Sequence, residues 1–201
     1  MPRPHALTLL LTGFGPFPGV PVNASAALVA NLAPAARKAH PGVNVQTAIL
    51  PTQWQLGPAQ ARAAIARLKP DIAIHFGVSE RASGFVIERA GANACLAIAD
   101  AAGHLPPLAV LDPAGPHERQ ATLPVDTIVR ALTAQGLPVT ASSDAGRYLC
   151  NAVLYQSLSL PAGPAMAGFV HIPAILDTRS LTLKQAQTGA LAIIAACLAC
   201  P

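Results

Sequence analysis

The strongest constraint on the fold is an alternation of short apolar segments with segments whose apolar residues recur at helical spacing. The apolar segments predict strands at residues 6–12, 43–50, 71–76, 138–142 and 167–171. Helices are predicted at residues 24–39, 54–68, 125–135 and 183–199, together with one that contains Cys150. This alternation favours an α/β fold, a three-layer sandwich with a mixed, mostly parallel central sheet and helices on both faces.

Two segments depart from this regular pattern. Pro34 lies inside the first predicted helix and is expected to kink or split it. Residues 99–122 are rich in Pro, Gly and Ala without a clear period, so they predict an excursion outside the sheet. No repeat or linker divides the chain, and residues 1–201 are interpreted as one domain.

The composition predicts a globular protein and argues against two classes of partner. The chain is 52% hydrophobic and only 11% charged, which indicates extensive burial and favours a subunit interface. Its net charge of +4 is spread thinly, and a nucleic-acid surface would need clustered cations. Dispersed cations include Arg3, Arg37, Lys38, Arg62 and Arg67. No apolar stretch is long enough for a membrane helix, and residues 189–200 better suit a buried terminal helix.

The cysteines indicate a reducing compartment. Cys95, Cys150, Cys197 and Cys200 lack the spacing of a disulfide framework, and the Cys197–Cys200 pair has no second pair to complete a zinc site. The apolar residues 6–11 are followed by no small-residue cleavage pattern, so no signal peptide is predicted. We therefore expect a cytoplasmic protein with neither metal nor cofactor.

Cys150 and His171 are the residues that most strongly indicate catalysis. Cys150 ends a loop that enters a predicted helix, and His171 closes the predicted strand that follows. A helix N-terminus stabilises a thiolate, and a nearby imidazole can hold or return its proton. The alternative is that Cys150 is a buried apolar residue and His171 a structural histidine.

Three separated segments carry a family resemblance. Residues 12–17 read T-G-F-G-P-F and are followed by N-A-S at residues 23–25. Residues 88–93 read E-R-A-G-A-N. Residues 142–151 read S-S-D-A-G-R-Y-L-C-N, and F-V-H-I-P follows at residues 169–173. In their order and separation these motifs resemble those of the pyrrolidone-carboxylate peptidases, or pyroglutamyl peptidases I, a family of intracellular cysteine peptidases.

The resemblance implies a phosphorylase/hydrolase-like fold and a Cys-His-Glu triad. Cys150 would attack the carbonyl that follows an N-terminal pyroglutamyl residue and form a thioester, and His171 would serve as base and acid. Glu88 would orient the imidazole, although it could instead be a solvated carboxylate paired with Arg89. The resemblance also implies a homodimer or homotetramer that acts on pyroglutamyl peptides.

The lactam ring of such a substrate calls for a small apolar slot rather than a charged subsite. Similarity to the family assigns the substrate-binding positions to Phe14, Phe17, Asn23, Thr52, Val78, Ile98, Tyr148 and Leu149. The aromatic members would form the walls. Asn23 could equally be the N-cap of the following helix, and similarity to the family implies that it also braces the pocket loop. Ordinary core packing is the alternative for each apolar member.

The chain departs from the family pattern in two places. Val78 occupies a position where the family usually has Gln, and residues 97–100 lack an Arg that lies near the attacked carbonyl in relatives. Arg81 on another loop is a possible substitute. Losing one charge-stabilising donor typically costs on the order of a hundredfold in rate. Because of these departures, the alternative is a catalytically weakened or lapsed homologue that binds pyroglutamyl ligands.

A nucleotide-binding module is the other alternative, because Gly13 and Gly15 follow the first predicted strand. A phosphate cradle needs successive backbone N–H groups, and Pro16, Pro18 and Pro21 remove donors from this loop. The glycine spacing also differs from that of a dinucleotide fingerprint, so this class is not favoured.

Overall fold

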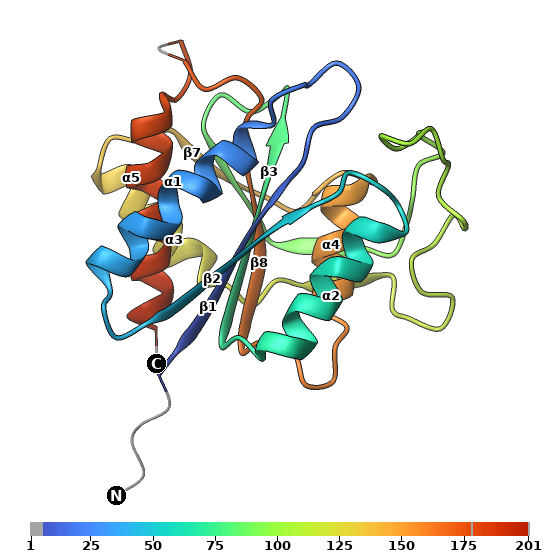
Figure 1. The fold of residues 1–201 in the computed structure, drawn as a ribbon, viewed down its shortest axis with the longest axis horizontal. Coiled ribbons are helices and arrows are strands. Elements are labelled where there is room, and N and C mark those ends of the chain that lie inside the picture. The colour runs from blue at the N-terminus through green and yellow to red at the C-terminus, as the bar shows by residue number, and fades with distance from the viewer. Residues whose placement is uncertain (1–5, 178, 201) are drawn as a thin grey trace, which may run out of the picture.

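The computed structural model describes residues 6–177 and 179–200, and its centre is a six-stranded sheet between two layers of helices (Figure 1). The strands are β1 (Thr8–Phe14), β2 (Asn44–Leu50), β3 (Ile72–Ser79), β4 (Phe85–Glu88), β7 (Val139–Ser142) and β8 (Met166–Pro173). Their order is β2-β1-β3-β8-β4-β7. The first four are parallel, β4 is antiparallel to β8, and β7 is parallel to β4. The prediction of a mixed, mostly parallel sheet is confirmed.

The helices cover both faces of the sheet. Figure 1 shows α1 (Ala24–Ala39), α3 (Val125–Ala134) and α5 (Leu183–Leu198) on one face, and α2 (Leu56–Leu68) and α4 (Leu149–Ser157) on the other. The core between the sheet and α1, α3 and α5 contains residues such as Leu28, Phe76 and Ile193. A second core, beneath α2 and α4, contains Phe14 and Phe169. The three-layer prediction is therefore confirmed.

Pro34 was expected to kink or split the first helix. The predicted split is wrong, because α1 runs unbroken from Ala24 to Ala39. Pro34 and Ala30 both lie on the exposed side of α1. Proline removes the hydrogen bond to the carbonyl four residues earlier, and on this side water can replace that bond.

The main element that sequence periodicity did not predict is β4, which has only four residues. Beyond it, β5 (Ala90–Ala92) pairs antiparallel with β6 (Glu118–Gln120) in a separate two-stranded sheet. The segment between β5 and β6 contains no helix or strand and lies beside α4 in Figure 1. The predicted excursion from the main sheet is therefore present.

Within the described residues, no helix is long and apolar enough to cross a membrane. Most of the apolar stretch at residues 189–200 belongs to α5, where Ala190, Ile193 and Ile194 are fully buried. The predicted domain begins with residues that lie outside the described part of the chain, Arg3 among them.

Candidate active site

Cys150 is the second residue of α4 and is half-buried. The loop before it turns at Gly146, whose φ of 77° lies in the left-handed region that glycine adopts without strain. The carboxylate of Asp144 accepts hydrogen bonds from the Gly146 N–H and from the Arg147 side chain. The first N–H groups of a helix have no carbonyl partner within the helix, and its N-terminus favours negative charge. The sulfur thus lies where an anion is stabilised.

His171 and Glu88 form a buried ion pair on neighbouring strands. The Nδ1 atom of His171 lies 2.8 Å from Oε1 of Glu88. The pairing of β4 with β8 places Val86 opposite His171 and Glu88 opposite Phe169, so the carboxylate reaches the imidazole diagonally. The other oxygen of Glu88, Oε2, is buried and has no hydrogen-bond partner among the described residues.

The thiol of Cys150 also lies close enough to the side chain of His171 to interact with it. Because Nδ1 of His171 faces Glu88, Nε2 is the ring nitrogen that remains for Cys150. Burial by itself would lower the pKa of His171, but the negative charges of Cys150 and Glu88 and the hydrogen bonds to both raise it above its usual value. These interactions therefore favour the protonated form of the His171 imidazole.

Gly77 on β3 makes room for this sulfur. A Cβ atom at position 77 would lie 3.0 Å from Sγ of Cys150 and 2.6 Å from Cζ of Phe169. Such distances are shorter than real contacts, so only glycine leaves space here for both groups. Neither Gly77 nor Phe169 was a candidate from the sequence. The spacing of Phe169, two residues before His171 on a strand, was the available signal.

A small, mostly apolar pocket opens beside Cys150. It is lined by Phe14, Phe17, Asn23, Thr52, Val78, Tyr148, Leu149 and Cys150. Seven of the eight sequence-predicted substrate-binding residues are in this lining, and they come from β1, β3, the start of α4 and the loops that follow β1 and β2. The ends of distant strands therefore meet at one edge of the sheet, as expected for parallel strands.

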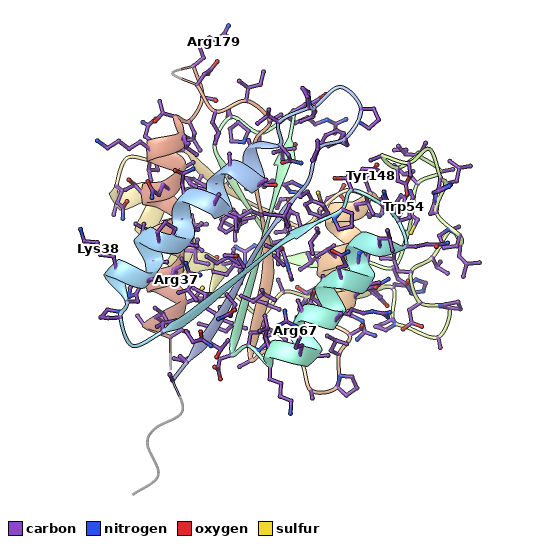
Figure 2. The ribbon with its side chains drawn as sticks, viewed as in Figure 1. Arg37, Lys38, Trp54, Arg67, Tyr148 and Arg179 are labelled. Carbon is purple, nitrogen blue, oxygen red and sulfur yellow. The ribbon has the colours of Figure 1, made fainter. Side chains whose placement is uncertain are left out.

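Ile98 is the predicted residue that the structure leaves out of this lining. Ile98 is 47% exposed, and its backbone oxygen accepts a hydrogen bond from Nε1 of Trp54. The Tyr148 hydroxyl donates to the Ala99 oxygen at 3.1 Å, and the rings of Trp54 and Tyr148 meet edge to face (Figure 2). The segment around Ile98 thus supports the Tyr148 wall from outside the pocket.

Asn23 and Thr52 direct their donors at the same backbone atom. Nδ2 of Asn23 and Oγ1 of Thr52 each donate to the oxygen of Gly15 at 3.0 Å. Asn23 is also the N-cap of α1, because its Oδ1 accepts from the Ser25 N–H. The helix cap and the brace of the pocket loop that were expected of Asn23 are both present.

Val78 faces away from the pocket with its side chain. Successive side chains of a strand point to opposite faces, and position 77 faces Cys150. The side chain of Val78 packs instead against the core beneath α1 and α5. The pocket therefore meets Val78 through its backbone, and the substitution of the family's Gln removes less from the pocket than the sequence suggested. Arg81, the proposed substitute cation, lies in an exposed turn after β3.

Comparison with known proteins identifies the family. Residues 7–196 match the pyroglutamyl peptidase family. The pyrrolidone-carboxylate peptidase of Pyrococcus furiosus is 33% identical over 178 residues, which cover 84% of this chain and 82% of that protein. The enzyme of the same name from Mycobacterium tuberculosis strain H37Rv is 31% identical over 206 residues, covering 94% of this chain and 91% of that protein.

Solved structures agree with the sequence relatives. A mutant pyrrolidone carboxyl peptidase from Pyrococcus furiosus superimposes with a TM-score of 0.87 at 28% identity, covering 96% of this chain and 98% of that one. Pyroglutamyl peptidase I from Bacillus amyloliquefaciens gives a TM-score of 0.85 at 29% identity, with the same coverage. The chain therefore belongs to the pyroglutamyl peptidase family of cysteine-type peptidases.

Proposed function

We propose that this peptidase releases an N-terminal pyroglutamyl residue from peptides by nucleophilic attack of Cys150, assisted by His171 and Glu88. The observation that carries this proposal is the hydrogen bond of Glu88 to His171, with Cys150 near the same imidazole and lining an apolar pocket. Such an arrangement activates a thiol and returns its proton.

The first step forms a thioester. The Sγ thiolate of Cys150 attacks the carbonyl carbon that links pyroglutamate to the next residue. The N–H groups of the first turn of α4 stabilise the oxygen that becomes negative. The imidazolium of His171 gives its proton to the departing amine nitrogen, and the C–N bond breaks. Glu88 keeps the imidazole oriented and stabilises its charged form.

The second step hydrolyses this acyl-enzyme. Neutral His171 takes a proton from water, and the resulting hydroxide attacks the thioester carbonyl. The C–S bond breaks, pyroglutamate leaves, and the thiolate and imidazolium are restored. The ion pair with which the cycle began is thus recovered without a metal or cofactor.

The pocket supports recognition of an uncharged lactam. Phe14, Phe17 and Tyr148 provide apolar walls. The side-chain donors of Asn23 and Thr52 are already hydrogen-bonded to the backbone oxygen of Gly15, so these two residues add no charge to the pocket. The backbone of Val78 can pair with the lactam amide, because one strand residue offers an N–H and a C=O toward the same neighbour. We therefore assign the substrate-binding role to the lining residues, and to Ile98 only the support of the Tyr148 wall.

Hydrolysis of pyroglutamyl-aminomethylcoumarin by wild type and by Cys150→Ala tests the proposal. Wild type should release the fluorophore. Cys150→Ala should release none while it still binds a pyroglutamate analogue, as measured by calorimetry. Binding without turnover in wild type would indicate the lapsed homologue instead. Iodoacetamide should label Cys150 selectively at neutral pH, and the analogue should block this labelling. If Cys150 is not labelled selectively in the absence of the analogue, the nucleophile is wrongly assigned.

We also propose that the chain forms a homodimer or homotetramer in the cytoplasm. Large apolar side chains are exposed on the segment between β5 and β6, among them Leu96, Leu105 and Leu108. Exposed apolar patches mark interfaces, and all four cysteines are free, as expected in a reducing compartment. A monomeric mass by light scattering would contradict the oligomer.

A further inference from the structure

Phe169 lies directly beneath the proposed catalytic histidine. Phe169 and His171 are two residues apart on β8, so their side chains share the face covered by α4. Their ring centroids are 4.8 Å apart with the planes tilted by 50°, and Phe169 is fully buried. The imidazole therefore rests on a ring that cannot move away into solvent.

The neighbouring strand completes the setting of this ring. His75 of β3 lies opposite Phe169, and Gly77 lies opposite His171. Because Gly77 has no side chain, the edge of the Phe169 ring and the sulfur of Cys150 occupy the space beside it. Phe169 also lies 6.3 Å, centroid to centroid, from Phe14, which lines the pocket. One buried ring thus supports the imidazole, borders the sulfur and backs a wall of the pocket.

We propose that Phe169 is a positioning residue whose ring fixes the imidazole of His171 between Glu88 and Cys150 and stabilises its protonated form. This inference rests on the catalytic role proposed for His171. An aromatic ring attracts a cation that lies over its face within about 6 Å of its centroid, and the attraction is stronger where water is excluded. The centroid distance of 4.8 Å lies within this range, and the full burial of Phe169 excludes water from its ring.

Two histidines flank the ring of Phe169, and the groups around them favour a charged imidazole only at His171. Glu88 on β4 and Cys150 on α4 face His171 and favour its cation. His75 on β3 lies on the other side of Phe169, with ring centroids 6.4 Å apart. Burial lowers the pKa of His75 to about 4, and its Nδ1 is hydrogen-bonded to Oγ1 of Thr12. His75 is therefore neutral at physiological pH and does not compete for the ring.

The test is the titration of His171 in the full-length protein with Phe169→Leu. Histidine ring signals are followed by NMR against pH, and His171 is assigned by its absence in His171→Asn. The matched control is Phe76→Leu, the same change at an equally buried ring in the core on the opposite face of the sheet. We expect the midpoint for His171 to fall by about one pH unit in Phe169→Leu and to stay in place in Phe76→Leu.

The alkaline limb of kcat/KM should move in the same direction in Phe169→Leu. Equal midpoints in the two variants would overturn the inference and leave Phe169 as ordinary core packing. If Phe169→Leu does not fold, Phe169→Met retains an adaptable apolar side chain without a ring and replaces it. Wild type that cleaves no pyroglutamyl substrate would refute the proposed function. The NMR titration would still decide whether Phe169 acts on His171.

Discussion

Gly77→Ala tests most directly how tightly β3 is packed against the nucleophile. The added Cβ would lie 2.6 Å and 2.8 Å from Cζ and Cε1 of Phe169 and 3.0 Å from Sγ of Cys150. Carbon atoms rest at about 3.5–4.0 Å from one another, so the neighbours must move by about 1 Å. Overpacking of this kind costs about 1–3 kcal/mol of unfolding free energy. A displacement of about 1 Å at the reacting atoms costs on the order of a hundredfold in rate.

Two assays separate the effect on stability from the effect on chemistry. Urea unfolding gives the loss of stability, and kcat/KM for pyroglutamyl-aminomethylcoumarin gives the loss of activity. Gly168→Ala is the matched control on β8, where an added Cβ would lie 2.5 Å from Cδ1 of Leu123 and away from the sulfur. We expect both variants to lose stability and only Gly77→Ala to lose about a hundredfold in kcat/KM. A folded Gly77→Ala with the activity of Gly168→Ala would refute the reasoning.

Three further perturbations follow from the same contacts. Glu88→Gln removes a charge that raises the pKa of His171. Because this pKa is raised in the folded protein, the contribution of His171 to the free energy of unfolding is complete below pH about 6.5 and is lost as the pH rises through the folded pKa. Urea unfolding against pH should show that loss at lower pH in Glu88→Gln; an unchanged profile would contradict the ion pair. Burial alone would raise the pKa of Asp100, but three backbone N–H donors lower it, so its stabilisation is lost as pH falls below about 3.9. Asp100→Asn should cost about 1–3 kcal/mol at neutral pH, since one amide oxygen cannot accept from all three; equal urea midpoints would refute this. Val78→Gln should leave KM unchanged, because its side chain faces the opposite core, and a marked fall in KM would show that it reaches the pocket.

The proposed nucleophile and its partner were predictable because their signals are local. A thiol at a helix entrance and a histidine at a strand end can be read from short segments around Cys150 and His171. The fold class was predictable because the alternation of strands and helices spans the whole chain. Glu88 could be chosen only through the family motif, since one carboxylate before an arginine is common on protein surfaces.

The amino-acid sequence by itself determined the order of the helices and of the strands of the main sheet other than β4, together with the candidates Cys150 and His171. Tertiary structure alone decided which side chains share a face. In the folded protein β4 runs antiparallel to β8, which brings Glu88 to His171. The side chain of Val78 packs in the core on the opposite face of the sheet, and Ile98 lies outside the pocket. Tertiary structure also brought Gly77 and Phe169 under the sulfur and the imidazole. These outcomes depend on strand direction and register between segments far apart in the chain, and local sequence spacing does not encode either.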